Sequence, residues 1–337
     1  MTESHLLKVC VFGAGAVGGY FGVRLAQSSA QVSVVARGAS LEAIQNRGWI
    51  LESEGQRLTS KVKAVSDPTQ LGLQDILIIA VKSHDLESAV DKVKPLLGPQ
   101  TLLIPALNGI PWWFCGESGQ PGALGRIHCV DKSGLIESSI PSSSVIGTVV
   151  YPSLSSPEPG LTRHHSGTKI VFGEPSSAPP GAATSLRLQS LVDLMRSSGL
   201  DAEISSDIRT EVWKKLMGNA CFNPVSLLTS SATDLMIDDP GTYQVFKSMM
   251  SELLEVGNAL GLRPNISVED RIALTRKLGH IKTSMLQDAE RGRKVEIDAI
   301  LGAACELGRK VNALTPTLDT VYSLARLKAI TEGLLSS

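Results

Sequence analysis

The sequence has few cysteines, and they show no pattern. The five cysteines are Cys10, Cys115, Cys129, Cys221 and Cys305. They are odd in number and widely scattered, with neither CxxC spacing nor a histidine pair at ligand spacing nearby. This distribution argues against a disulfide framework and against the common zinc motifs. We therefore expect free thiols in a reducing cytoplasm and no bound metal.

Long hydrophobic runs are also missing. The longest clean apolar run near the front of the chain, at 76–81, has six residues, whereas a membrane-spanning helix needs about 20. The first residues, Met1–His5, carry no basic segment followed by a long apolar stretch and a cleavage site, which is the pattern of a secretory signal. We expect neither a membrane span nor a signal peptide.

The chain has no excess of charge of either sign. Lys and Arg number 32 against 33 Asp and Glu, which gives a net charge of -1. Because nucleic-acid binding depends on a basic field, we expect no nucleic-acid partner. What the sequence does have is 42% hydrophobic and 19% charged residues, enough for a globular core. At about 100–200 residues per domain, 337 residues predict two domains.

The first half of the chain predicts an α/β domain. Short β-rich runs occupy 7–12, 31–36, 76–81, 101–106, 145–151, 169–172 and 202–204, and helical periodicity occupies 16–28 and 184–198. The continuous apolar runs predict a parallel sheet covered by helices on both faces. A Pro/Ser-rich link between 151 and 169 looks hairpin-like, and 175–183 looks like a loop.

The second half predicts helices only. Apolar residues recur at three- and four-residue spacing over 208–221, 242–260, 267–288 and 296–310. We place the domain boundary near Asp207, a residue type suited to an N-cap, which gives domains 1–207 and 208–337. Apolar faces of the helical half could pair in a homodimer, and the sequence leaves the oligomeric state open.

A glycine motif follows the first predicted strand and opens the first helix. Its residues are Gly13, Ala14, Gly15, Ala16, Val17 and Gly18. In this context the first glycine permits a tight turn, the second lets backbone approach a pyrophosphate, and the third lets the helix pack closely. The pyrophosphate would lie at the helix N-terminus. A glycine-rich turn without a ligand is the alternative, and the order of strand, turn, helix and strand favours dinucleotide binding.

The end of the second predicted strand bears on which dinucleotide binds. NAD-selective sites place an acidic residue there for the ribose 2′-OH, whereas an arginine accommodates a 2′-phosphate. This chain has Ala36-Arg37-Gly38 and no carboxylate. Arg37 therefore predicts NADP (NADPH), the alternative being an arginine that only caps a surface loop.

A polar line crosses the first helix of the second half. Lys215, Asn219 and Asn223 lie at i, i+4 and i+8, on one helix face. Lys214 is displaced by about 100°, so Lys215 is the better candidate for a directed role. Asn is disfavoured inside helices. Two Asn residues on the same helix face therefore indicate a specific role for that face. A solvated face or a buried hydrogen-bonded patch remains the alternative.

A second polar region lies further along the chain. It contains Ser284 and, after a basic turn, Glu296, which suits a helix start. The histidines lack partners at metal or triad spacing, and no Ser-His-Asp or Walker-type element is present.

Together these residues resemble the ketopantoate reductase family, also called 2-dehydropantoate 2-reductases, over nearly the whole chain. The matching motifs are Gly13-Ala-Gly-Ala-Val-Gly-Gly-Tyr20, Ala80-Val-Lys82, Leu107-Asn-Gly-Ile-Pro-Trp-Trp113, Trp213-Lys-Lys-Leu216 with Asn219 and Asn223-Pro224, and Ser284-Met-Leu-Gln-Asp288 with Glu296-Ile-Asp298. The resemblance implies an NADP-binding Rossmann domain, a helical domain like that of 6-phosphogluconate dehydrogenases, and a cleft between them. It also implies reduction of 2-dehydropantoate to (R)-pantoate with NADPH, in pantothenate and coenzyme A biosynthesis.

The resemblance also implies roles for individual residues. Lys215 would be the general acid and contact the substrate, and Glu296 would steady the lysine and contact the cofactor ribose. Lys82 would lie beside the nicotinamide half, and Arg37 would take the 2′-phosphate. The residues implied to hold the substrate's polar groups are Asn108, Asn219, Asn223 and Ser284, with Asn108 also against the cofactor.

One position departs from the family pattern. Several members carry a further Asn followed by Gly downstream of the Asn-Pro pair, where this chain has Ser231-Ala-Thr233-Asp234. Thr233 keeps a hydroxyl and lacks the carboxamide. A related branched 2-oxo acid is therefore an alternative substrate, and a non-catalytic NADP-binding sensor is an alternative function.

Overall fold

The structure is a computed structural model of the chain, and it describes residues 6–116, 123–176 and 184–335. The chain divides into two compact units. Unit 1 comprises Met1–Leu107 and Leu135–Ile208, and unit 2 comprises Asn108–Gly134 and Arg209–Ser337. Unit 2 is therefore built from two separate stretches of chain. Most of the predicted loop at 175–183 lies outside the described residues.

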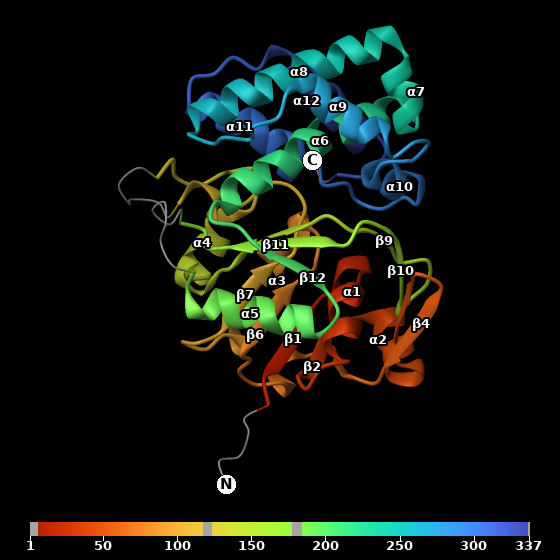
Figure 1. Cartoon of the computed structure of the whole chain (residues 1–337), viewed down its shortest axis with the longest axis vertical. Helices are drawn as coiled ribbons and strands as arrows, with labels where there is room; N and C mark the ends of the chain where they lie inside the picture. The colour runs from red at the N-terminus through yellow and green to blue at the C-terminus, as the bar shows by residue number, and fades with distance from the viewer. Residues whose placement is uncertain (1–5, 117–122, 177–183, 336–337) are drawn as a thin grey trace. The chain divides into compact units, whose positions relative to one another are not determined.

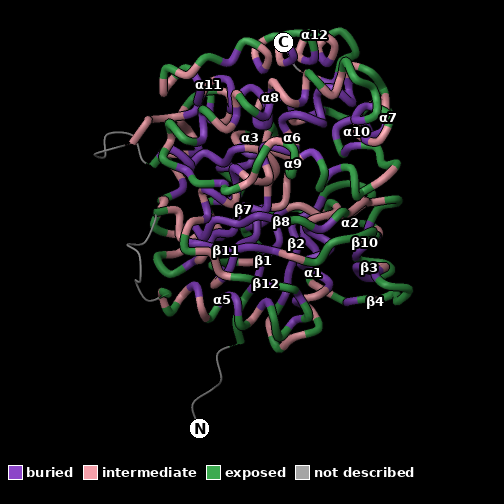
Figure 2. Tube along the Cα trace, turned by 45° about the horizontal axis from the view of Figure 1, so that its top comes forward, coloured by how far each residue is buried: buried purple, intermediate pink, exposed green. Residues whose placement is uncertain are grey.

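Unit 1 is built around a five-stranded sheet. In spatial order its strands are β5 (Lys63–Val65), β2 (Gln31–Val35), β1 (Lys8–Phe12), β6 (Ile76–Ile79) and β7 (Leu102–Pro105). Every neighbouring pair is parallel, which confirms the predicted Rossmann-type sheet. β6 is buried along its whole length, as expected of a strand covered on both faces. Figure 2 shows β1 and β2 among the buried parts of the trace.

Two smaller sheets complete unit 1. The first has the order β4 (Gln56–Ser60), β3 (Trp49–Ser53), β10 (Leu161–Ser166) and β9 (Ser153–Ser155), and the second has β12 (Asp201–Ile204), β11 (Lys169–Gly173) and β8 (Gly147–Val150). β8 and β11 pair antiparallel as a hairpin link requires. The link itself contains β9 and β10, and β10 pairs in parallel with β3, so it belongs to a sheet that the sequence did not predict.

The helices of unit 1 pack on these sheets (Figure 1). They are α1 (Ala16–Leu25), α2 (Gly38–Arg47), α3 (Ser83–Val93), α4 (Leu135–Ser139) and α5 (Leu186–Ser197), with 3-10 turns at Pro68–Gln70, Lys94–Leu96 and Ser142–Ser144. α1 lies against both β1 and β3. This is close packing, because a Cβ added at Gly22 would lie 2.0 Å from the Trp49 ring, and one at Gly19 would lie 1.9 Å from Thr162 Oγ1.

Unit 2 is helical, and none of its described residues belongs to a named strand, as predicted. Its helices are α6 (Ile208–Thr229), α7 (Thr233–Asp238), α8 (Pro240–Ala259), α9 (Val268–Arg276), α10 (Ser284–Glu290), α11 (Ala303–Lys310) and α12 (Pro316–Thr331), with a π-helical turn, η5 (Asp298–Gly302), and a 3-10 turn, η3 (Trp112–Cys115). The single helix predicted over 267–288 is wrong. Gly279, at φ +73°, and the Thr283 side chain, which caps α10, divide it into α9 and α10.

Buried aromatic side chains hold unit 2 together. The Trp213 indole donates to the Leu253 carbonyl at 3.1 Å, and its ring stacks on Phe114 with centroids 6.2 Å apart. Both side chains are 0% exposed. Because Phe114 comes from the 108–134 stretch, this stretch is part of the core of unit 2.

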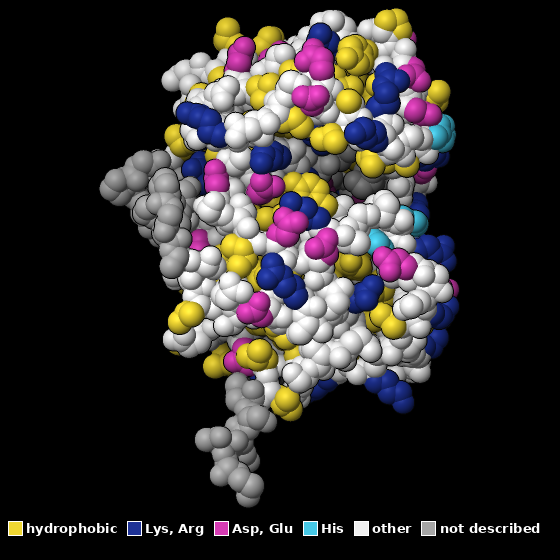
Figure 3. Space-filling model, viewed as in Figure 1, with side chains coloured by type: hydrophobic (Ala, Val, Ile, Leu, Met, Phe, Trp, Pro, Cys, Tyr) yellow, Lys and Arg dark blue, Asp and Glu magenta, His cyan; other side chains and the backbone are white. Residues whose placement is uncertain are grey.

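No helix among the described residues is long and apolar enough to cross a membrane. On the face drawn in Figure 3, Lys and Arg side chains are interspersed with Asp and Glu. This distribution agrees with the even balance of charge in the sequence.

Candidate active site

The three glycines of the motif serve three different purposes. Gly13 has φ +113°, and a Cβ there would lie 2.8 Å from the Ala80 carbonyl oxygen. A Cβ on Gly18 would lie 2.0 Å from the Gly13 carbonyl oxygen. A Cβ on Gly15 would meet nothing within 4 Å. The first and third glycines are thus required by contacts inside the protein, whereas the second borders open space, as a pyrophosphate site needs.

The N-terminus of α1 adds an electrostatic reason for an anion to bind here. Gly15 is its N-cap, so no side chain caps the helix, and its first turn, which opens with Ala16 and Val17, has no acidic residue. The unpaired N–H groups and the helix dipole of such an end favour negative charge. The motif, with Ala14 between its first two glycines, therefore fits a dinucleotide pyrophosphate.

Arg37 and Lys82 follow the two strands that flank β1. Arg37 is the N-cap of α2 and lies two residues after the end of β2, and Lys82 is the N-cap of α3 after β6. Because β1 pairs with both strands in parallel, their carboxyl ends share one edge of the sheet. Arg37 is exposed, and its guanidinium makes no ion pair or hydrogen bond within the part of the chain that the structure describes. It is free to take a phosphate.

α6 carries the polar line as predicted. Asn223 is 6% exposed and Asn219 is part-buried. Neither carboxamide is hydrogen-bonded to any described residue. Lys214, on another face, donates to Glu211 at 2.8 Å. Neither carboxamide is among the buried polar atoms that lack a partner, so both are accessible from outside the protein and available to a polar ligand.

Lys215 lies among a carboxamide and a carboxylate from two other parts of unit 2. Its Nζ donates to Asn108 Oδ1 at 2.9 Å. Burial lowers the pKa of Lys215 from 10.5 to about 8, and the nearby Glu296 carboxylate opposes this by favouring the ammonium form. A lysine whose pKa lies near neutral pH is suited to donate and accept a proton.

Ser284 and Thr233 are placed differently. Ser284 is exposed at the first position of α10, and its hydroxyl makes no hydrogen bond to another described residue. Thr233 is 2% exposed, and its hydroxyl is within hydrogen-bond reach of the carbonyls of Gly279, at 2.8 Å, and Ile281, at 3.3 Å. This hydroxyl is therefore engaged by the protein backbone.

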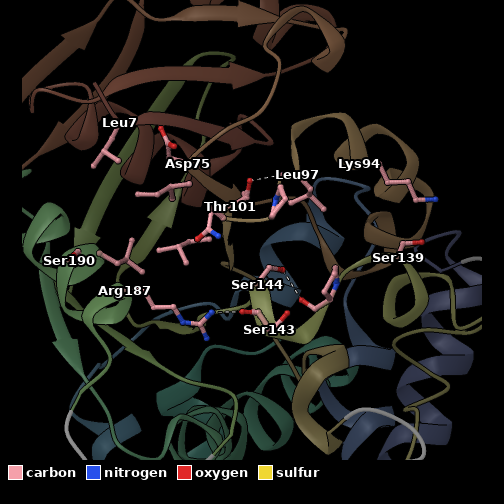
Figure 4. Close-up of a pocket in the computed structure, with 17 residues that line it drawn as sticks. Leu7, Asp75, Lys94, Leu97, Thr101, Ser139, Ser143, Ser144, Arg187 and Ser190 are labelled. Atoms are coloured by element: carbon pink, nitrogen blue, oxygen red, sulfur yellow. Dashed lines mark hydrogen bonds between the residues drawn. The ribbon is translucent and has the colours of Figure 1, made fainter. Parts of the chain in front are cut away.

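A cavity of about 710 Å³ opens at the amino ends of β6 and β7, at the opposite edge of the sheet from the glycine turn. Leucine side chains and serine hydroxyls line it, with Arg187 at one side (Figure 4). Arg187 is paired with Glu174, and Lys94 at the rim is paired with Asp91 at 2.8 Å. Both of its cationic side chains are thus engaged within the protein.

Among the described residues no group of three or more His, Cys, Asp and Glu side chains is arranged to hold a metal ion. The residues predicted as site residues fall into two groups. In unit 1 the glycine motif, Arg37 and Lys82 follow one edge of the sheet. In unit 2 the structure brings Asn108 and Glu296 to Lys215, whereas it records no hydrogen bond between Ser284 and these residues.

Comparison with known proteins gives matches over nearly the whole chain. Residues 9–177 match the family described as ketopantoate reductase PanE/ApbA, and residues 207–329 match its C-terminal domain. A 2-dehydropantoate 2-reductase of Mesorhizobium japonicum is 43% identical over 98% of this chain and 100% of that protein.

Solved structures agree. The crystal structure of a ketopantoate reductase homologue from Ralstonia solanacearum is 41% identical, covers 98% of this chain and 100% of its own, and has a TM-score of 0.91. A D-mandelate dehydrogenase with bound NADH has a TM-score of 0.81 at 20% identity, covering 98% of this chain and 100% of its own, and this likeness shows the fold.

Proposed function

Because the chain belongs to the ketopantoate reductase family, whose members are pyridine-nucleotide oxidoreductases, we propose that it reduces 2-dehydropantoate to (R)-pantoate with NADPH. The observation that carries the proposal is the Lys215 ammonium, which donates to Asn108 at 2.9 Å and has a pKa of about 8. A ketone reductase needs such a group, because hydride addition to the ketone carbon creates an alkoxide that must be stabilised and protonated.

The first part of the proposal concerns the nucleotide. The open space at Gly15 and the uncapped N-terminus of α1 would hold the pyrophosphate, and the unpaired Arg37 would hold the 2′-phosphate of NADPH. Lys82 would lie beside the nicotinamide half. NADPH supplies the hydride when it is bound. The protein's part is to bind and orient.

The second part concerns the proton. Lys215 would donate a hydrogen bond to the ketone oxygen and then give up its proton to that oxygen. Asn108 Oδ1 accepts from the lysine and so fixes the direction of the ammonium. Glu296 counters the effect of burial on the pKa, so that the ammonium form is populated at neutral pH. It would also contact the cofactor ribose.

The third part concerns substrate binding. The carboxamides of Asn219 and Asn223, one and two helical turns from Lys215, have no partner among the described residues and would bind the substrate's hydroxyl and carboxylate. Asn108 and the exposed Ser284 hydroxyl would add to this set. Each carboxamide both donates and accepts, which suits a substrate that carries both kinds of group.

A second candidate function is the reduction of a branched 2-oxo acid without the terminal hydroxyl. The specific observation is Thr233, whose hydroxyl is engaged by the carbonyls of Gly279 and Ile281. Where several family members have a carboxamide, the hydroxyl of residue 233 in this chain therefore has no free hydrogen to donate to a substrate. A substrate with an apolar far end would lose less binding free energy from the absence of this carboxamide.

A matched pair of ketones separates the candidates. Purified protein and NADPH are given either 2-dehydropantoate or trimethylpyruvate, the same branched 2-oxo acid without the terminal hydroxyl, and the loss of NADPH absorbance is followed. We expect a higher kcat/KM with 2-dehydropantoate. An equal or higher value with trimethylpyruvate would favour the second candidate. Tight NADPH binding without turnover of any 2-oxo acid would instead indicate an NADP-binding sensor.

Two further expectations from the sequence accompany this proposal. A homodimer is supported by the exposed Leu324 and Leu327 on one face of α12, 55% and 63% exposed, and sedimentation equilibrium of the purified chain would measure its mass. A cytoplasmic location is supported by the five cysteines, all of which are free thiols.

A further inference from the structure

The π-helical turn η5 interrupts regular helix close to the proton donor. It covers Asp298–Gly302 and begins two residues after Glu296. The Ile300 N–H donates to the Glu296 carbonyl at 3.1 Å, so the residue that acts on Lys215 is part of the same hydrogen-bonded turn. π-turns are rare and frequently occur at functional sites.

The π-turn also holds the segment that carries Asn108. Ile110, which is not part of the π-turn, donates its N–H to the Ala299 carbonyl of that turn at 2.9 Å. Gly109, between Ile110 and Asn108, has φ +84°, and a Cβ there would lie 2.4 Å from the same carbonyl oxygen. Only glycine permits this approach. Because Asn108 precedes it directly, the place of the π-turn determines where the Asn108 carboxamide meets Lys215.

Tyr322 of α12 contacts both ends of the π-turn. Its hydroxyl donates to Asp298 Oδ1 at 2.8 Å, and Arg326 Nε lies 3.5 Å from the same oxygen. At the other end, a Cβ on Gly302 would lie 2.9 Å from the Tyr322 hydroxyl oxygen and 3.0 Å from its ring. Burial and the Asp298 carboxylate raise the pKa of Tyr322 above its ordinary value, so the hydroxyl keeps its proton and remains a donor.

We propose that Tyr322 is a positioning residue for the proton donor: through Asp298 it fixes the π-turn, which in turn keeps Asn108 Oδ1 on Lys215 Nζ and Glu296 near the ammonium. The effect is indirect, because no hydrogen bond joins Tyr322 to Lys215 among the described residues. The inference rests on the proposed function for its consequence on turnover. Its consequence for the state of Lys215 stands without any substrate.

The test is Tyr322→Phe in the full chain, which removes only the hydroxyl. We expect kcat to fall about 10- to 100-fold, as a small misplacement far from the chemistry can produce, with the KM for NADPH unchanged. We also expect the pH at which kcat/KM is half-maximal to move below that of the unaltered protein. This follows because Asn108 and Glu296 favour the ammonium form of Lys215, and weakening either lowers its pKa.

A second readout needs no turnover. The rate at which an amine-specific reagent labels Lys215, followed by peptide mass spectrometry as a function of pH, reports the pKa of the lysine directly. We expect the labelling curve of Tyr322→Phe to shift to lower pH. If no 2-oxo acid is reduced but this shift appears, the proposed function fails and the positioning role stands.

Matched controls separate positioning from general damage. Tyr243→Phe makes the same change on α8, at a hydroxyl with no hydrogen bond to a described residue, and should leave every readout unchanged. Gly109→Ala should reproduce the effect of Tyr322→Phe. Gly261→Ala, at φ +77° with nothing within 4 Å, should show only the cost of the backbone strain. If Tyr322→Phe lowers thermal stability yet keeps kcat and the labelling curve of the unaltered protein, Tyr322 is structural only and the proposal is overturned.

Discussion

Lys215 illustrates how surroundings set the chemistry of a residue. Alone, a lysine is almost fully charged at neutral pH and a poor proton donor to a ketone. Burial lowers its pKa to about 8, and the Glu296 carboxylate prevents a larger fall. At this pKa both the ammonium and the free amine of Lys215 are populated near neutral pH.

The pKa of Lys215 should make the rates of reduction and oxidation depend on pH. Reduction needs the ammonium, so kcat/KM for the ketone should be constant at low pH and fall tenfold per pH unit above about 8. Oxidation of the alcohol needs the free amine, so its kcat/KM should rise through the same region. Initial rates in both directions over a pH series would measure this.

The Lys215→Met variant is the control for that assignment. Its kcat should be lower by about 10²–10⁴, the usual contribution of general acid catalysis, and the alkaline limb should disappear. A limb that persists in Lys215→Met would assign the titration to another group.

Arg37 should decide the preference between the two nucleotides. Arg37→Ala should raise the KM for NADPH about 10- to 150-fold, since a charge-assisted hydrogen bond contributes about 1.5–3 kcal/mol, and should leave the KM for NADH nearly unchanged. Arg47→Ala on the same helix, an exposed arginine paired with Glu158 at 3.1 Å, should change neither. Equal losses with the two nucleotides would remove Arg37 from the 2′-phosphate.

Individual site residues can be predicted from the sequence more readily than the partners that they contact. Helical spacing alone put Lys215, Asn219 and Asn223 on one face. Spacing could not show that Asn108, 107 positions away, accepts from Lys215, because that contact depends on tertiary packing. The resemblance to a family supplied Asn108 and Glu296. Gly109 and Tyr322 were missed, although the Asn108-Gly109 pair is a turn signal that predicts a positive φ.

At the scale of elements, α1 shows how glycines can shape a helix. Gly18, Gly19 and Gly22 each occupy a place where a Cβ would meet an atom within about 2 Å. Glycine disfavours helix by about 0.5–1 kcal/mol relative to alanine. The helix tolerates this cost because its glycine face has no side chains and lies directly on Trp49 and Thr162. Both of these residues are at most 1% exposed.

Gly22→Ala should therefore destabilise the protein in spite of the better helix propensity of alanine. Overpacking against the buried Trp49 ring costs about 1–3 kcal/mol, more than the gain in propensity. Gly241→Ala in α8, where the nearest atom is Asp239 Oδ1 at 3.2 Å, should be neutral or slightly stabilising. Urea unfolding midpoints of both variants measure the difference, and equal midpoints would contradict the packing argument.

Elements were predicted where their residues are apolar and continuous. β1, β2, β6 and β7 were found because strands buried on both faces have a strong pattern. β4 was missed because four of its five residues are exposed or part-buried. The break between α9 and α10 was missed because apolar periodicity continues across Gly279. The π-turn could not be predicted from the spacing of apolar residues, because its extra residue changes that spacing only over one turn.

At the scale of the whole molecule, unit 2 is completed by a stretch far from the rest of its sequence. Residues 108–134 supply Asn108 to Lys215, Phe114 to Trp213, and the N–H groups of His128 and Cys129 to the Glu306 carboxylate at 2.8 and 3.0 Å. The helical half thus has neither a full core nor a full site without them.

A fragment of residues 209–337 alone should therefore fail to unfold cooperatively. A fragment in which 108–134 is joined to 209–337 through a flexible linker should restore a cooperative thermal transition and the near-ultraviolet circular dichroism of the buried Trp213. A cooperative transition in the shorter fragment would show that the helices are sufficient by themselves.

The split of unit 2 has a consequence for how the chain is made. The aromatic turn of Trp112, Trp113 and Phe114 leaves the ribosome well before its partner helix α6 exists. Between the two stretches lies Leu135–Ile208, whose roughly seventy residues take about 4–15 s to synthesise at 5–20 residues per second. Side chains that are at most 5% exposed in the finished protein remain without their final partners during that interval. The nascent chain then presents an apolar segment of the kind that chaperones bind.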